Sequence, residues 1–151
     1  MKTLSNQITR SPTALNKRGR KVVVDGYRFD SQKEANFYVR FVRNSGANFK
    51  VHPRYELLPA FNLGGKHIRR IDYTPDFVIY DDSGQMIHVY DVKNGFTVYA
   101  IDTSVKLRFK LFAKRYNRFV ECVVVRAHDF KTHTFYYDRK DDIHVHKSIF
   151  Y

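Results

Sequence analysis

The chain has 151 residues, and its 27 Lys and Arg against 15 Asp and Glu give it a formal net charge of +12. Its hydrophobic share of 43%, with 13 Phe and 11 Tyr, suffices for one buried core and excludes a wholly disordered protein. The excess of positive charge favours an anionic partner, which can be a nucleic acid, a membrane surface or an acidic protein.

The sequence contains no segment that we expect to enter a membrane. No window approaches the roughly twenty apolar residues of a transmembrane helix. The N-terminus lacks the apolar core of a secretory signal, and Cys122 is the only cysteine, which is typical of a reducing compartment. We therefore expect a cytoplasmic protein without membrane contacts.

The first segment, residues 1–20, predicts a flexible basic arm. No Asp or Glu occurs between Met1 and Val24, while Lys and Arg recur among Ser, Thr, Asn and Pro. Such a composition is typical of a solvated terminus that contacts anionic partners. Arg18 and Arg20 are candidate nucleic-acid contacts at its end.

A short β-ribbon and a helix are expected next. Asp25-Gly26 separates two β-rich runs and is the dipeptide best suited to a tight hairpin, so we expect an N-terminal ribbon. Ser31 and Glu34 have the spacing of a capping box, in which each side chain bonds to the other residue's backbone amide. Apolar residues continue at helical spacing, which predicts a helix over 31–44.

The middle of the chain reads as β-structure. Residues 49–58 are β-rich but contain Pro53, which is typical of a bulged or edge strand. Two further β-rich runs, 67–80 and 86–93, flank a turn sequence at 81–84 and predict a β-hairpin.

A basic helix is expected over residues 102–117, with Asp102 or Thr103 as its N-cap. Apolar residues recur there at spacings of four, three and four, so one helix face is apolar. The other positions carry Lys and Arg without any acid, as in a nucleic-acid contact surface or an ordinary solvated face. The candidate contacts on this helix are Lys106, Arg108, Lys110 and Lys114.

The remaining elements complete one domain of the α/β class. Residues 119–125 are apolar enough for a buried strand, and a further strand over 132–137 is weaker. We expect one mixed central sheet flanked by helices, with the order helix, three strands, helix, strand. The domain would span residues 21–138 and leave a C-terminal tail at 139–151.

Two acids inside the predicted hairpin strands are the most informative, Asp76 and Asp91. If Ser83-Gly84 is a two-residue loop, the two acids stand directly opposite each other, where like charges are destabilising. Lys93 lies two residues beyond Asp91 and therefore on the same strand face. A Mg²⁺ ion commonly binds through one or two carboxylates, and a lysine beside it can orient water; a plain salt bridge is the alternative interpretation.

Two further acids bear on this cluster. Glu34 lies on the inward side of its helix, from which a carboxylate can reach a metal at the sheet edge, although capping alone also explains a Glu there. Asp72 precedes Asp76 by four residues and is a candidate substitute ligand.

These residues resemble a known motif. The string Tyr-Thr-Pro-Asp-Phe at 73–77, followed by Asp-Val-Lys at 91–93, resembles the PD-(D/E)XK motif of restriction-endonuclease-like nucleases. Glu34 resembles the additional acid of that superfamily, and the expected order αβββαβ is its core. More narrowly, the chain resembles small phage-encoded endonucleases related to Holliday-junction resolvases. The resemblance covers residues 25–126.

The resemblance implies a role for each matching residue. Asp76 and Asp91 would be metal ligands, with the Val92 carbonyl as a further ligand, Lys93 as the water-orienting base, and Glu34 binding a second metal. The metal would be Mg²⁺, with Mn²⁺ as a substitute. The chain departs from many relatives, which have Glu in place of Asp91 and Gly directly after the lysine.

The expected function is that of a metal-dependent DNA endonuclease selective for branched or junction DNA, acting in phage recombination or DNA processing. If phage-encoded, it would work in the host cytoplasm, and a homodimer would suit the cutting of two strands. Two alternatives stay open: a non-catalytic DNA-binding module with the same fold, and a nuclease subunit of a larger phage or transposition complex.

Overall fold

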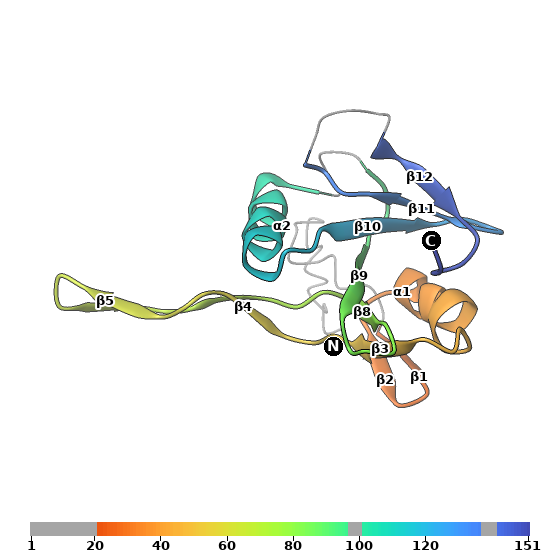
Figure 1. The fold of residues 1–151 in the computed structure, drawn as a ribbon, viewed down its shortest axis with the longest axis horizontal. Coiled ribbons are helices and arrows are strands. Elements are labelled where there is room, and N and C mark those ends of the chain that lie inside the picture. The colour runs from red at the N-terminus through yellow and green to blue at the C-terminus, as the bar shows by residue number, and fades with distance from the viewer. Residues whose placement is uncertain (1–20, 97–100, 137–141) are drawn as a thin grey trace, which may run out of the picture.

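The computed structural model describes residues 21–96, 101–136 and 142–151. The predicted basic arm, with Arg18 and Arg20, lies outside these residues. A six-stranded sheet with the order β12-β11-β10-β9-β8-β3 forms the centre of the molecule (Figure 1). Its strands are β3 Asn48–Val51, β8 Phe77–Tyr80, β9 Met86–Val92, β10 Val120–Val125, β11 Phe130–His133 and β12 His144–His146.

The sheet is mixed, which confirms the predicted α/β class. Strands β9 and β10 are parallel, and the other neighbouring strands are antiparallel. The crossover between β9 and β10 contains α2, as a parallel connection requires. Within the segment predicted as a tail, β12 pairs with β11 and Ile149 is buried, so this part of the chain completes the sheet.

Two helices cover opposite faces of the sheet. Helix α1 spans Gln32–Phe37 and continues as a π-helical turn, η2, over Tyr38–Val42, while α2 spans Thr103–Tyr116. Both begin where a side-chain cap was predicted: Ser31 Oγ accepts from the Glu34 amide at 3.1 Å, and Asp102 Oδ1 accepts from the Val105 amide at 2.9 Å. These caps satisfy amide groups that have no partner within the helix.

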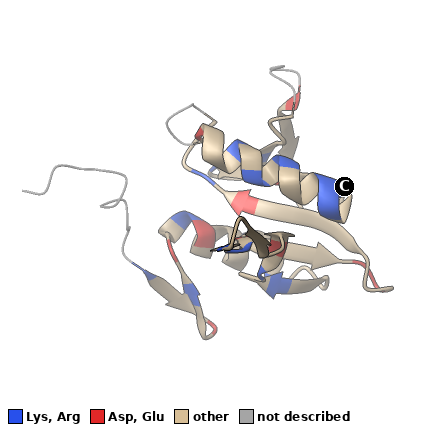
Figure 2. Ribbon diagram, turned by 90° about the vertical axis from the view of Figure 1, so that its left-hand side faces the viewer, with Lys and Arg blue, Asp and Glu red and all other residues tan. Residues whose placement is uncertain are grey.

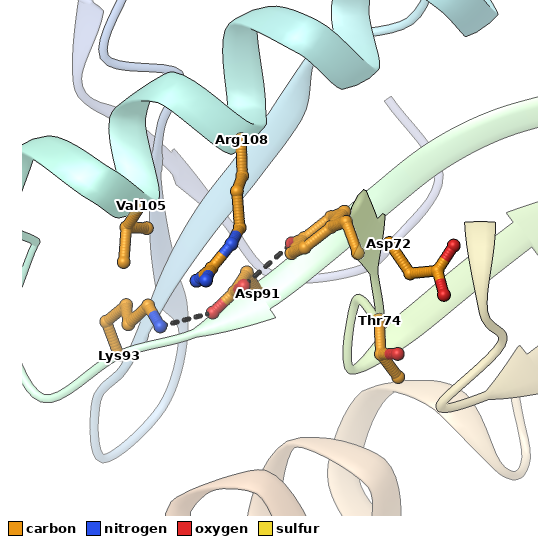
Figure 3. Close-up of a pocket in the computed structure, with 7 residues that line it drawn as sticks. Asp72, Thr74, Asp91, Lys93, Val105 and Arg108 are labelled. Carbon is orange, nitrogen blue, oxygen red and sulfur yellow. Dashed lines mark hydrogen bonds and ion pairs between the residues drawn. The ribbon is translucent and has the colours of Figure 1, made fainter. Parts of the chain in front are cut away.

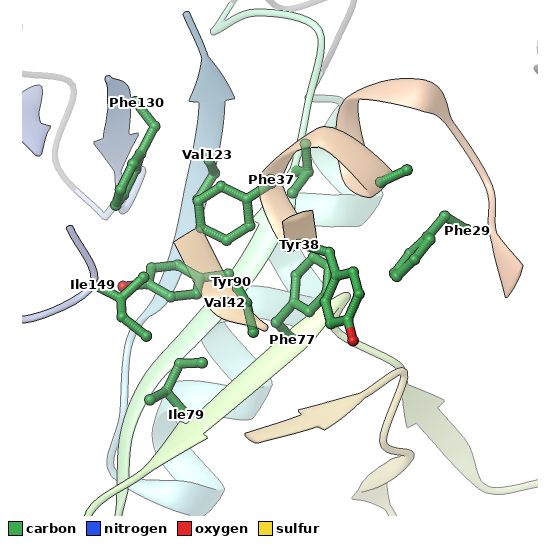
Figure 4. Packing of buried hydrophobic residues seen from close by; sticks show 12 residues of the cluster. Phe29, Phe37, Tyr38, Val42, Phe77, Ile79, Tyr90, Val123, Phe130 and Ile149 are labelled. Atoms are coloured by element: carbon green, nitrogen blue, oxygen red, sulfur yellow. The ribbon is translucent and has the colours of Figure 1, made fainter. Parts of the chain in front are cut away.

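Strand alternation divides the core between the two faces. Phe77, Ile79 and Tyr90 pack with α1 and η2 in one cluster, which Figure 4 shows in close-up. Val78 and Val89 pack with α2 on the opposite face. Since neighbouring residues of a strand point to opposite faces, Asp91 lies on the α2 face.

The N-terminal ribbon is confirmed. Strands β1 Val22–Val24 and β2 Tyr27–Phe29 pair antiparallel around Asp25 and Gly26, whose φ angles are 51° and 81°. Positive φ at both central residues is the requirement of a type I′ turn, and it explains why this dipeptide closes the ribbon.

The structure corrects the two long strands predicted over 49–58 and 67–80. The first breaks at His52 (φ 50°) and Pro53, because neither continues a strand ladder. The second breaks before Pro75. The residues between these breaks, Tyr55–Tyr73, form a two-stranded projection, here called the β-arm, that extends away from the sheet in Figure 1. Its strands are β4 Tyr55–Leu58, β5 Phe61–Leu63, β6 Lys66–Ile68 and β7 Ile71–Tyr73.

The β8–β9 hairpin has the predicted register but a different turn. The loop contains three residues, Asp82–Gly84, because the Asp81 amide donates to the Gln85 carbonyl at 2.9 Å. A β-bulge on β9 then restores the expected pairing, so that Phe77 faces Tyr90. The predicted two-residue loop is therefore wrong, while the pairing it implied near Asp76 is present.

Among the described residues, no helix is long and apolar enough to cross a membrane.

Candidate functional site

Asp91 lies near the end of β9 and has two side-chain partners. Lys93 Nζ lies 2.8 Å from its Oδ1, and the Tyr73 hydroxyl donates to its Oδ2 at 2.7 Å (Figure 3). The Asp91 side chain is buried, and Lys93 is on the same face, as strand alternation predicted. The site thus holds a buried carboxylate between an ammonium and a phenol.

Lys93 carries a positive charge in this arrangement. Burial by itself lowers the pKa of Lys93, but the neighbouring charge of Asp91 and its hydrogen bond outweigh burial and raise the pKa above its ordinary value. An ammonium group donates hydrogen bonds and has no lone pair to accept a proton.

Asp76 lies directly before β8 and is bound to β9 through its side chain. Its Oδ2 accepts from the Val92 amide at 2.6 Å, and its backbone amide donates to the Tyr90 carbonyl at 3.0 Å. The pKa of Asp76 is raised well above its ordinary value, first by burial and then by the negative charges of Asp91 and Glu34. The structure therefore brings Asp76 near Asp91 and Glu34, two of the other acids that the sequence had singled out.

Glu34 reaches this region from the start of α1. Its Oε2 accepts from the Asp30 amide at 3.3 Å and lies 3.2 Å from His52 Nε2. The expected return bond of the capping box therefore goes to the residue before Ser31. The Glu34 side chain is buried, so it points into the molecule as predicted.

His52 links the acids and was missed in the sequence. Its Nε2 lies 3.8 Å from Asp76 Oδ1 in addition to its contact with Glu34. Asp30, Glu34 and His52 offer ligand atoms that all lie within 4.8 Å of one another, which suits a metal ion. A histidine directly before the strand-breaking Pro53 was the only local sign of this role.

A cavity of about 210 Å³ opens on the α2 side of Asp91. It is lined by Asp72, Tyr73, Thr74, Asp91, Lys93, Val105 and Arg108. Asp72 Oδ2 accepts from Arg54 Nε at 2.7 Å and from Arg70 Nε at 2.9 Å, and its carboxylate points away from Asp91 in Figure 3. Asp72 Oδ2 is therefore engaged by arginines, while Asp72 Oδ1 is buried and has no hydrogen-bond partner among the described residues. The role of Asp72 as a substitute ligand stays a prediction.

The basic residues of α2 differ in their positions. Figure 2 shows Lys and Arg recurring along this helix. Arg108 lines the cavity beside Lys93, while Lys110 and Lys114 are exposed. Lys106 Nζ lies 5.7 Å from the centre of the Phe135 ring. Among these four residues, Arg108 is the one that lines the cavity containing Asp91.

Cys122 lies opposite Asp91 in the β9–β10 pairing and is fully buried. Burial, followed by the charge of Asp91, raises the pKa of the thiol well above its ordinary value. A protonated thiol is a poor metal ligand, so Cys122 is not expected to bind a metal beside Asp91.

One protein family matches the chain. Its profile covers residues 16–132, and the family is described as proteins of unknown function, DUF1064. The chain belongs to the DUF1064 family. The DUF1064 match contains Glu34, His52, Asp76, Asp91 and Lys93. No curated protein and no solved structure matches the chain.

Proposed function

We propose that this chain is a metal-dependent DNA endonuclease that hydrolyses phosphodiester bonds. The observation that carries the proposal is a pair of carboxylates at the ends of neighbouring strands, the half-buried Asp76 and the buried Asp91, with Lys93 bound to Asp91. The charge of Asp91 raises the pKa of Asp76 and so disfavours a charged Asp76, which a bound cation would relieve.

The residues fit a hard divalent cation. Asp76, Asp91 and the Val92 carbonyl would hold Mg²⁺ or Mn²⁺, and Glu34 would serve a second ion. Asp30 and His52 complete a donor set around Glu34. When bound, Mg²⁺ would lower the pKa of a water molecule and neutralise charge on the phosphate.

Lys93 would position the attacking water. Its ammonium donates hydrogen bonds to the water oxygen and offsets the negative charge that grows on the phosphate. The water oxygen forms a bond to phosphorus while the bond to the 3′ oxygen breaks, which leaves 5′-phosphate and 3′-hydroxyl ends. One proton of the water passes to solvent, and the 3′ oxygen takes one up. A role for Lys93 as base requires that the charge of Asp91 is first compensated.

The arrangement of elements supports the resemblance to restriction-endonuclease-like nucleases. Helix α1 precedes the antiparallel strands β3, β8 and β9, and α2 then leads to β10, which is parallel to β9. With the β-arm counted as an insertion between β3 and β8, this order of elements is compatible with the αβββαβ core that the resemblance implies. The exposed Lys and Arg side chains of α2 favour an anionic substrate. We extend the proposal to branched or junction DNA in phage recombination. A homodimer would cut both strands.

One observation favours a second candidate, a non-catalytic DNA-binding module. Both oxygens of the Asp91 carboxylate already have protein partners, Lys93 and Tyr73. A purely structural ion pair would look the same. This candidate predicts DNA binding that is sensitive to salt and indifferent to metal.

Cleavage of defined DNA by purified protein tests the proposal. Linear duplex, single-stranded and four-way-junction DNA, with matching RNA, are incubated with Mg²⁺, Mn²⁺ or EDTA. Asp91→Asn and Lys93→Ala should reduce cleavage by at least about 100-fold, the usual scale for lost charge stabilisation in a reaction centre.

The control variants are Asp82→Asn, an exposed acid in the β8–β9 turn, and Lys33→Ala, an exposed lysine on α1. Both should cleave like the wild type. Cleavage that persists in Asp91→Asn and Lys93→Ala contradicts the site. Salt-sensitive binding without cleavage under any metal condition would favour the binding module.

A further inference from the structure

The β-arm is exposed on both of its faces. Every residue from Leu58 to Ile71 is exposed, including Phe61 at 43% and Leu63 at 70%. An isolated two-stranded ribbon is at best marginally stable in water, so a long exposed ribbon is suited to binding a partner.

The base of the β-arm is fixed to the body of the protein beside the candidate site. The Tyr55 ring packs on Phe112 at 5.3 Å between ring centres, and Arg115 Nη2 lies 2.9 Å from Glu56 Oε1. Tyr73, the last residue of β7, packs on α2 and donates to Asp91. A partner held by the β-arm is therefore held at a fixed position relative to Asp91.

The positive charge of the β-arm favours an anionic partner. No acid occurs from Leu57 to Ile71, while Lys66, Arg69 and Arg70 lie within this stretch. The β-arms of two copies would repel each other because both are positively charged, and the net charge of +12 on each chain adds to this repulsion. A phosphate backbone is attracted to the same residues.

The two faces of the β-arm tip carry different groups. Asn62 faces His67 across the ribbon, with Oδ1 and Nδ1 3.1 Å apart, and both can bond to base edges. Phe61 and Ile68 face each other on the opposite side, where apolar groups can contact sugars and thymine methyl groups. The major groove of B-DNA admits a two-stranded ribbon of this kind.

We propose that the β-arm lies in a groove of duplex DNA and holds the duplex to one side of the candidate site. The proposal rests on the proposed function for the identity of that site. From Asp72 to the tip at Gly64 the strand extends about 26 Å, at about 3.3 Å per residue. Arm contacts would therefore reach about eight base pairs from the scissile phosphate, at about 3.4 Å per base pair.

DNA binding in EDTA tests the β-arm without requiring cleavage. The variant Lys66→Gln/Arg69→Gln removes two exposed charges and leaves Arg70, which pairs with Glu56 and Asp72. The matched control, Lys33→Gln/Lys147→Gln, removes two exposed charges elsewhere. The DNA is a duplex of about 30 base pairs, long enough to contact both the β-arm and the body of the protein. Its affinity is measured by fluorescence anisotropy across a salt series, and hydroxyl-radical footprints are recorded on the same duplex.

The arm variant should lower the slope of log affinity against log salt by about 2, since each phosphate contact contributes about 0.9. Its footprint should lose about eight base pairs on one side, while the control keeps the wild-type slope and footprint. An unchanged slope and footprint overturn the proposal. A second result would also overturn the proposal: sedimentation shows a wild-type dimer in the absence of DNA, and Phe61→Ser converts this dimer to a monomer. The β-arm would then bind a second copy of the chain.

The two proposals fail separately. Cleavage together with an unaltered footprint in the arm variant contradicts only the β-arm proposal. Loss of the one-sided footprint in a protein that never cleaves supports the β-arm and contradicts the endonuclease.

Discussion

At the scale of single residues, Tyr73 is the contact that orients the Asp91 carboxylate, the proposed metal ligand. Its hydroxyl fixes one oxygen of Asp91, while its ring packs on Phe109 of α2. The phenol thereby sets the direction in which the remaining lone pairs of Asp91 point. If Asp91 is the metal ligand that we propose, the residue that holds it in this way affects metal affinity as well as stability.

We expect Tyr73→Phe to weaken Mn²⁺ binding by about 10–100-fold, as is usual when the partner of a metal ligand is removed. Isothermal titration calorimetry measures this affinity, and thermal unfolding reports the fold. The control is Tyr55→Phe, which loses a hydroxyl contact of 2.7 Å to Tyr80 in the same α2-side cluster. Equal Mn²⁺ affinity in the two variants would contradict the role given to Tyr73.

The site residues that the sequence predicted and the one that it missed differ in which contacts fix their positions. Asp76, Asp91 and Lys93 could be placed from the sequence because one local hairpin sets their pairing and their faces. His52 could not, since its approach to Glu34 and Asp76 depends on β3 pairing with β8 and on its own left-handed backbone. Long-range pairing leaves no sign at a single position.

At the scale of elements, the β8–β9 hairpin shows how two irregularities cancel. The three-residue loop shifts the pairing, and the bulge near Ile79 shifts it back. The sequence could predict a turn and a hairpin, but not this loop length. The β-arm could not be predicted for a related reason. Residues 67–80 are β-rich throughout, and the break before Pro75 arises because the residues before it pair within the β-arm while those after it pair within the central sheet.

Gly84 closes the hairpin loop with a φ of 84°, a conformation that favours glycine. We expect Gly84→Ala to cost about 1 kcal/mol and to lower Tm by about 2–4 °C. Cleavage at about 25 °C, well below Tm, should persist because this substitution changes neither the length of the loop nor the bulge that together set the pairing near the site.

Differential scanning calorimetry measures the change in Tm. Gly84→Asn is the conservative control, since Asn tolerates positive φ better than Ala does. If Gly84→Ala is no less stable than Gly84→Asn, the loop conformation does not determine the stability of the hairpin.

At the scale of the whole molecule, we expect the acid cluster to make stability depend on pH and, through the proposed metal site, on metal. The pKa of Asp76 is raised in the folded state, so between its unfolded pKa and this raised pKa the folded protein binds more protons. In EDTA its contribution to stability is therefore present at low pH and is lost as pH rises through the raised pKa. Bound metal should restore this stability at neutral pH.

We expect Asp76→Asn to remove this component of the pH dependence and to raise Tm in EDTA at neutral pH. Mg²⁺ at about 100 times its Kd should stabilise the wild type by about 2.7 kcal/mol and the variant by less. Tm is measured in EDTA and in Mg²⁺ across the pH range, with Asp82→Asn as control. A lower Tm for Asp76→Asn in EDTA at neutral pH would contradict the repulsion between the acids.

The buried Cys122 gives this molecule an internal reporter. The thiol is the only one in the sequence and lies in β10 opposite Asp91. Because it is fully buried, a thiol-alkylating reagent can reach it only when the protein opens around it. The rate of alkylation therefore reports how often the strand pair that carries Asp91 opens. The measurement uses the native protein and needs no introduced label.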